Sequence, residues 1–181
     1  VEKASNLGKE VYNCLDKIEN LVDFDFKRVV YLGSGSLGKL TKEARLKILE
    51  LTAGEVAAVW ESSMGFRHGP KSFIDENTLV ISFVSSNPYT KAYDLDILDE
   101  IENDNIAKKI IGISSTKLDR DYELIFEVDG LDDVYLSLVY IIVAQIIALI
   151  KSLKIGNTPD NPSRTGTVNR VVKGVTIHEY K

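Results

Sequence analysis

The chain has 181 residues, of which 44% are hydrophobic and 27% charged, a composition that fits one globular domain with its own core. Its 22 basic and 27 acidic residues give a net charge of −5, and the basic residues are dispersed, so we expect no nucleic-acid partner and no anionic membrane partner. The single cysteine, Cys14, excludes an intrachain disulfide, and with only His68 and His178 we expect no metal site. The first ten residues carry Lys3 and Lys9 without an apolar run, so we predict no signal peptide and a cytoplasmic location.

Apolar spacing along the chain predicts an alternation of helices and strands. A helix is expected over residues 2–21, and five buried strands over residues 28–32, 56–60, 78–84, 109–113 and 124–128. Helices are expected over 39–52 and 89–102, and a short helix that Pro70 begins contains Phe73 and Ile74. The strands are continuous β-branched runs, which are typical of a parallel sheet covered on both faces. We therefore predict a doubly wound, three-layer α/β/α sandwich with a five-stranded parallel sheet.

Residues 134–150 form an almost wholly apolar run, interrupted only by a few polar side chains such as Gln145. The run is shorter than a bilayer core requires and is bracketed closely by Asp132, Asp133 and Lys151. We expect a helix buried between the sheet and a neighbouring domain or subunit, with a membrane span as the alternative.

Ligands of doubly wound folds bind beyond the carboxyl ends of the strands, which directs attention to residues 33–38, 61–70 and 85–90. The first of these loops has the pattern G-x-G-x-x-G, formed by Gly33, Gly35 and Gly38. With Glu61 as a ribose-binding carboxylate, it could hold a dinucleotide. With the hydroxyls of Ser34 and Ser36, it could equally hold a small phosphorylated ligand, and a glycine turn without a ligand is the third interpretation.

The other two loops also allow two interpretations each. His68 stands before Gly-Pro on a constrained backbone, where its imidazole could shuttle a proton or hydrogen-bond the backbone as a loop staple. In the loop 85–90, hydroxyls and free N–H groups could hold an anion, or Asn87 or Thr90 could simply cap the following helix.

The predicted helix over 39–52 carries Glu43, Lys47 and Glu50 at positions i, i+4 and i+7, which form one stripe. The spacing alone favours a solvated, salt-bridged face. The alternative is a carboxylate placed for acid–base work with a lysine to tune it.

Several segments together resemble one family. Residues 29–36 (VVYLGSGS), 65–72 (GFRHGPKS), 83–90 (FVSSNPYT) and the tail 156–178 look like the C-terminal sugar isomerase (SIS) domain of the tagatose-6-phosphate ketose/aldose isomerase family, also described as galactosamine-6-phosphate deaminase/isomerase. The resemblance implies an N-terminal helix or linker over residues 1–26, an SIS domain over 27–155 and a tail over 156–181 that closes over the active site.

The resemblance also implies roles for particular residues. A Lys-x-x-Glu helix motif of related isomerases matches Lys47 and Glu50, so Glu50 would move a proton between C1 and C2 of the sugar with Lys47 beside it. His68 would open the sugar ring, often from a neighbouring subunit, and Lys173 of the tail would close over the substrate. Further candidates for contact with the sugar phosphate are Gly33, Ser34, Gly35, Ser36, Arg67, Ser85, Ser86 and Thr90.

The implied activity is isomerisation of a hexose 6-phosphate, or deamination with isomerisation when C2 carries an amine, without a metal or organic cofactor. Full-length members have two SIS domains, and the main phosphate loop belongs to the N-terminal one. The loop 85–90 lacks the glycine of that phosphate loop. We therefore expect a second SIS domain, from a missing N-terminal half or a neighbouring subunit, and a homodimer. A non-catalytic sugar-phosphate sensor and a dinucleotide binder are the competing classes.

Overall fold

The computed structural model describes residues 1–158, 160–161, 163–168 and 174–180. Five strands form one sheet in the order β2-β1-β3-β4-β5, and every neighbouring pair is parallel. The strands are β1 (Arg28–Gly33), β2 (Ala57–Glu61), β3 (Thr78–Phe83), β4 (Lys109–Ser114) and β5 (Glu123–Ile125). Because β2 and β3 lie on opposite sides of β1, the order in which strands are added to the sheet changes direction at β1. This topology confirms the predicted doubly wound sheet.

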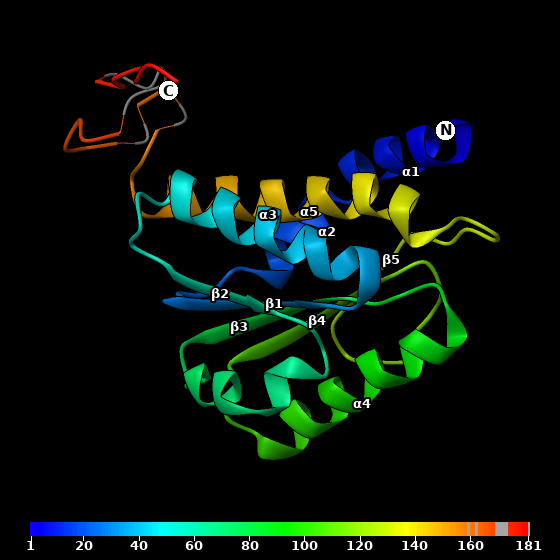
Figure 1. The fold of residues 1–181 in the computed structure, drawn as a ribbon. Helices are drawn as coiled ribbons and strands as arrows, with labels where there is room; N and C mark the ends of the chain where they lie inside the picture. The colour runs from blue at the N-terminus through cyan, green and yellow to red at the C-terminus, as the bar shows by residue number, and fades with distance from the viewer. Residues whose placement is uncertain (159, 162, 169–173, 181) are drawn as a thin grey trace.

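Helices cover both faces of the sheet (Figure 1). One face carries α1 (Glu2–Asn13), α2 (Leu15–Leu21), α3 (Gly35–Leu51) and α5 (Asp133–Lys154). The other carries α4 (Pro88–Asp104) and two short 3₁₀ helices, η1 (Gly65–Arg67) and η2 (Gly69–Phe73). The three-layer sandwich is therefore as predicted. The single helix predicted over 2–21 is wrong in detail, because the backbone leaves helical dihedral angles at Cys14 (φ −99°, ψ 10°).

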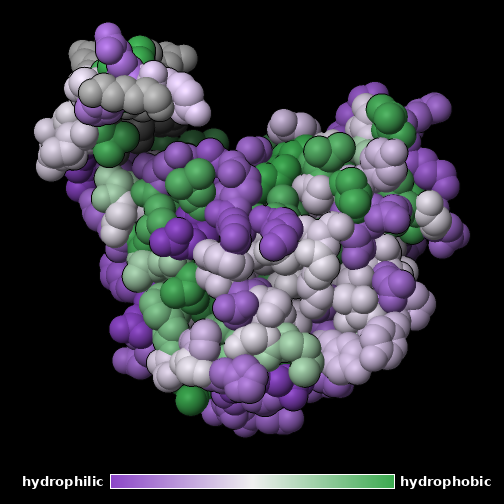
Figure 2. Space-filling view, in the orientation of Figure 1, coloured by the Kyte–Doolittle hydropathy of each residue, from purple (hydrophilic) through white to green (hydrophobic). Residues whose placement is uncertain are grey.

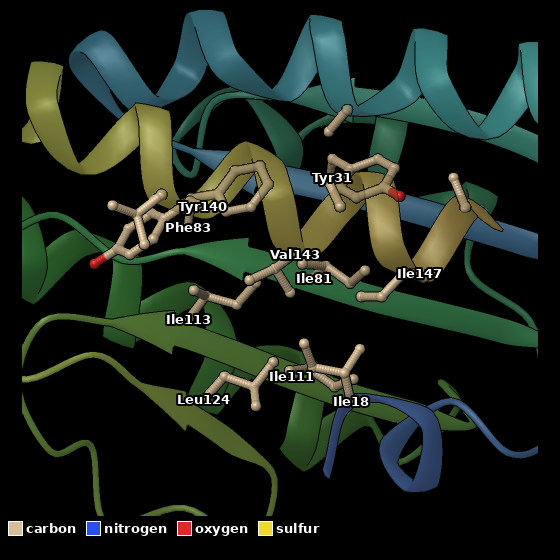
Figure 3. Packing of buried hydrophobic residues seen from close by; sticks show 14 of the residues in the cluster. Ile18, Tyr31, Ile81, Phe83, Ile111, Ile113, Leu124, Tyr140, Val143 and Ile147 are labelled. Carbon is tan, nitrogen blue, oxygen red and sulfur yellow. The ribbon is translucent and has the colours of Figure 1, made fainter. Parts of the chain in front are cut away.

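The core on the α3 and α5 side is built around an aromatic row. Tyr31 of β1 stacks on Phe83 of β3, and Phe83 stacks on Tyr140 of α5, with 6.1 Å between ring centroids in each pair (Figure 3). All three side chains are fully buried. The row connects α5 to two central strands, so the helix is held along the sheet (Figure 1).

The core on the opposite side is smaller and fixes the segment after β2. Phe66 of η1 is fully buried and belongs to the same cluster as Val30, Ile97 and Ile101. The segment between β2 and β3 is thereby packed against α4 on the face of the sheet opposite α3.

α5 is long and apolar enough to cross a membrane by length and composition alone. One side of it is buried, at Leu136, Val139, Tyr140, Val143, Ala144, Ile147, Ala148, Lys151 and Ser152. The other side exposes apolar residues, at Val134, Tyr135, Leu138, Leu149 and Leu153. Figure 2 shows hydrophobic surface over the layer of α1, α3 and α5, interrupted by polar side chains. The buried side is that of a core helix, and the other side leaves an apolar stripe exposed on this chain.

Candidate active site

The loops that follow β1, β2 and β3 meet on one buried carboxylate. The hydroxyls of Ser34 and Ser63 each donate to Oδ1 of Asp94 at 2.5 Å, and the N–H of Ser85 donates to Oδ2 at 2.9 Å. Asp94 lies on α4 and is fully buried. Burial raises the pKa of its carboxyl, although the hydrogen bonds from the three serines act in the opposite direction. Asp94 thus joins three strand-end loops to α4.

A second carboxylate, that of Asp133, accepts hydrogen bonds from Ser85 and Ser86. Asp133, the first residue of α5, accepts from the Ser85 hydroxyl at 2.6 Å and from the Ser86 N–H and hydroxyl at 2.7 Å each. The hydroxyls of Ser34, Ser85 and Ser86 therefore donate to carboxylates of their own chain. Two carboxylates at this edge of the sheet would also repel a phosphate.

Local backbone geometry explains much of the glycine loop. A Cβ on Gly38 would lie 2.9 Å from the carbonyl oxygen of Gly33, so this close approach of strand and helix needs a glycine. Gly35 has a φ of +55°, in the left-handed region, and Ser36 is exposed in the first turn of α3.

Glu61, at the end of β2, is folded back on its own loop, where it accepts from the N–H of Ser62 at 2.7 Å.

The loop 85–90 ends in a helix cap. The side-chain oxygen of Asn87 accepts from the N–H groups of Tyr89 at 3.0 Å and Thr90 at 3.2 Å. The capping interpretation of Asn87 is confirmed. Since the Thr90 N–H is used in the cap, this helix start offers fewer free donors than the sequence suggested.

The charged stripe of α3 lies at the other end of that helix. The Lys47 ammonium is 2.8 Å from the Glu50 carboxylate and 3.2 Å from that of Glu43. The hydrogen bond to Glu50, and then that to Glu43, raise the pKa of Lys47. Glu50 lies 15 residues after Gly35, or about 22 Å along the helix axis. The stripe is therefore far from the strand-end loops.

The segment that follows α5 is anchored beside this end of α3 (Figure 1). The buried Asn157 side chain donates to the Leu51 carbonyl at 3.1 Å and accepts from Arg164 at 2.6 Å, and Arg164 lies 3.0 Å from Glu55. These contacts bring the tail to the turn after Glu50. Lys173 lies outside the described residues.

His68 is exposed between η1 and η2, on the α4 side of the sheet. It borders an open cavity of about 590 Å³ that Lys71, Ile101 and Asp104 also line. Glu50 stands on α3, which covers the opposite face. A single copy of the chain therefore does not bring His68 and Glu50 together. Within the described residues, no group of three His, Cys, Asp or Glu side chains is placed to hold a metal ion.

A family model, that of the SIS domain, matches residues 24–149. The chain belongs to the SIS domain family. The match includes the whole parallel sheet and ends within α5, so it covers the fold that carries Glu50, Lys47 and His68.

Two curated relatives and one solved structure are similar to this SIS domain over most of its length. The D-galactosamine-6-phosphate deaminase AgaS of Escherichia coli is 49% identical over 160 residues, which are 86% of this chain and 42% of that protein. The protein of the same name from Shewanella sp. (strain ANA-3) is 46% identical over 154 residues, which are 85% of this chain and 38% of that protein. The crystal structure of tagatose-6-phosphate ketose/aldose isomerase from E. coli superposes with a TM-score of 0.87 at 39% identity, over 99% of this chain and 47% of that one. The chain thus spans less than half the length of each.

Sequence reasoning missed two carboxylates of this SIS domain, Asp94 and Asp133. Asp94 takes the first place in an otherwise apolar buried stripe of α4, with Ile97, Leu98 and Ile101. A carboxylate in such a stripe is unusual and indicates a buried hydrogen-bonded group. Asp133 carried no comparable signal, because acidic residues are common at helix starts.

Proposed function

We propose that this SIS domain is one half of a phosphosugar aldose/ketose isomerase or amino-sugar-phosphate deaminase/isomerase of the cytoplasm. Its substrate would be a hexose 6-phosphate of the tagatose-6-phosphate or galactosamine-6-phosphate type. The names of relatives that are 49% and 39% identical support this substrate class. The observation that carries the proposal is the Lys47–Glu50 pair, 2.8 Å apart on a partly exposed face of α3.

The proposed reaction is a proton transfer by Glu50. Its carboxylate removes the proton from the carbon next to the carbonyl, and the electron pair of that C–H bond moves to form an enediolate. Glu50 then returns the proton to the neighbouring carbon, while the hydroxyl proton of the first carbon passes to the former carbonyl oxygen, so that the carbonyl moves by one position. Lys47 stabilises the negative charge that develops on the sugar oxygen. When C2 carries an amine, the same transfer gives an imine, which water hydrolyses to a ketose with release of ammonia.

The rest of the site would come from other chain segments. His68 and Glu50 lie on opposite faces of the sheet. We therefore propose a homodimer, in which His68 of one copy opens the ring of the sugar that is bound beside Glu50 of the other copy. We assign phosphate binding to a second SIS domain, since the serines here donate to Asp94 and Asp133. That second domain would cover the apolar stripe of α5.

In this proposal residues 27–155 form the SIS domain, residues 1–26 precede it and residues 156–181 close over the site, with Lys173 above the sugar. No step of the proposed reaction depends on the other candidate contacts to the sugar phosphate, which are Gly33, Gly35, Ser36, Arg67 and Thr90. Glu61 does not support the dinucleotide alternative, because its carboxylate accepts a hydrogen bond from Ser62.

A ligand panel tests the proposal. The intact protein that carries this chain would be incubated with tagatose 6-phosphate, galactosamine 6-phosphate, fructose 6-phosphate and NAD, and its melting temperature and product formation measured. We expect at least one hexose 6-phosphate to raise the melting temperature and to be converted, because a ligand that binds only the folded state stabilises it. Stabilisation by NAD alone, or binding of a sugar phosphate without turnover, would contradict the proposal.

A further inference from the structure

The residues on either side of His68 are held by one carboxylate of α4. One oxygen of Glu100 lies 3.1 Å from the Arg67 guanidinium, and the other lies 2.5 Å from the Lys71 ammonium. Lys71 also lies 2.8 Å from Asp104, one turn further along α4. Glu100 thus bridges the two ends of the five-residue stretch from Arg67 to Lys71, which contains His68.

The same helix fixes the start of this segment. Ser63 donates to Asp94 at 2.5 Å, and Phe66 is buried against Ile97 and Ile101. The segment between β2 and β3 therefore follows α4 from its middle to its end. The stretch around His68, in contrast, is held to α4 by partly exposed ion pairs.

His68 itself depends on this framework. In the part of the chain that the structure describes, its imidazole makes no hydrogen bond, and its side chain is exposed. The backbone, which has φ −82° and ψ −145° before Gly69 and Pro70, therefore sets the position and direction of the Cα–Cβ bond that carries the imidazole. A movement of Arg67 or Lys71 would therefore displace the backbone that carries the imidazole.

We propose that Glu100 is a positioning residue for His68. By binding Arg67 and Lys71 together, it fixes the backbone that presents the imidazole to the site. The proposal rests on the proposed function where it gives His68 the ring-opening step. Glu100, Arg67 and Lys71 have side chains 26% to 32% exposed, and ion pairs with this exposure contribute little to stability, so a neutral variant is expected to fold.

Glu100→Gln in the intact protein tests this role, with Glu102→Gln as the matched control. Glu102 lies on the same helix and pairs with Arg120 at 2.6 Å, away from the His68 segment. Each variant would be assayed on a normal, mostly cyclic hexose 6-phosphate and on an analogue without the C4 and C5 hydroxyls, which cannot close its ring. Hydrogen exchange of the amides in residues 65–72 would be measured on the same samples.

We expect Glu100→Gln to lose on the order of 10- to 100-fold in kcat on the cyclic substrate, as small misplacements of a catalytic group do. On the open analogue we expect it to stay within about threefold of the wild type, because the step at Glu50 is untouched. Exchange in residues 65–72 should rise in Glu100→Gln and not in Glu102→Gln.

Unchanged activity on the cyclic substrate, or an equal loss on both substrates, would overturn the positioning role. If the wild-type protein converts no hexose phosphate, the proposed function is wrong. Hydrogen exchange is then the only test of whether Glu100 positions residues 65–72. Unchanged exchange in residues 65–72 of Glu100→Gln would overturn the positioning of this segment by Glu100 in that case too.

Discussion

Lys47 and Glu50 lie one turn apart on α3, with the ammonium of the first 2.8 Å from the carboxylate of the second. Glu43 approaches the same ammonium from the preceding turn, at 3.2 Å. An ion pair on a helix surface usually contributes well under 1 kcal/mol to stability. The Lys47–Glu50 pair is notable for its location, because the segment after α5 is anchored beside it through Asn157 and Arg164.

The buried junction of the strand-end loops should be sensitive to loss of its carboxylate. Asp94→Ala would leave the hydroxyls of Ser34 and Ser63 and the N–H of Ser85 without their acceptor in a buried position. We expect a loss of about 3 kcal/mol in the free energy of unfolding, measured by urea denaturation. Asp94→Asn keeps one acceptor and should lose less, about 1 kcal/mol. A loss below about 0.5 kcal/mol in the alanine variant would show that the junction is not structural.

The ion pair of Asp25 and Lys151 predicts a pH-dependent part of the stability. The hydrogen bond from Lys151, followed by that from Lys27, lowers the pKa of Asp25 to about 2. Because the folded pKa is below the ordinary value of 3.8, the contribution is complete above about pH 4 and disappears as the pH falls through about 2. Asp25 is 69% exposed, so we expect Asp25→Asn to lose only about 1 kcal/mol at pH 7.

Urea denaturation of the wild type and Asp25→Asn at pH 7, 5, 4 and 3 checks this. The difference in free energy of unfolding should be constant from pH 7 to 5 and narrow below pH 4. A difference that grows as the pH falls would contradict the assignment.

The apolar stripe of α5 predicts a contact with the rest of the intact protein. Leu138 and Leu153 are 61% and 55% exposed here. If the second domain covers them, Leu138→Asp with Leu153→Asp should lower the melting temperature of the intact protein by several degrees, since each buried leucine contributes about 2 kcal/mol. Tyr122→Asp, at an exposed apolar residue beside β5, is the control and should have little effect. Equal melting temperatures for the double variant and the control would show that this stripe stays uncovered.

Most of the fold could be predicted from the sequence, because β-branched runs and helical spacing are local signals. The strands at Arg28 and Thr78 begin where predicted. The break at Cys14 could not be predicted, since apolar spacing continues through it and no glycine or proline marks it. The last strand is predicted over 124–128, whereas β5 covers Glu123–Ile125. Phe126 and Val128 still donate backbone hydrogen bonds to Ser114 and Ser115, so the end of the strand depends on where β4 ends.

The candidate site was predictable in its residue types and not in its arrangement. The spacing of Lys47 and Glu50 predicts their pairing, and the structure has it. The partners of Asp94 are 60, 31 and 9 residues away in sequence, so no local pattern reveals that junction. The separation of His68 from Glu50 follows from the crossover of β2 to the edge of the sheet, which only the assembled topology shows.

The most direct test of the account is solvent deuterium incorporation into the sugar phosphate by the intact protein and its Glu50→Gln variant. Glu43→Gln, which changes the other carboxylate beside Lys47, is the matched control. If Glu50 moves the proton, Glu50→Gln should lose on the order of 10²- to 10⁴-fold in the rate of deuterium incorporation while the sugar phosphate still binds with nearly wild-type affinity, because the amide keeps size and hydrogen bonding but accepts no proton. Glu43→Gln should stay close to the wild-type rate. Incorporation by Glu50→Gln at the wild-type rate would contradict the account and give the proton transfer to another residue.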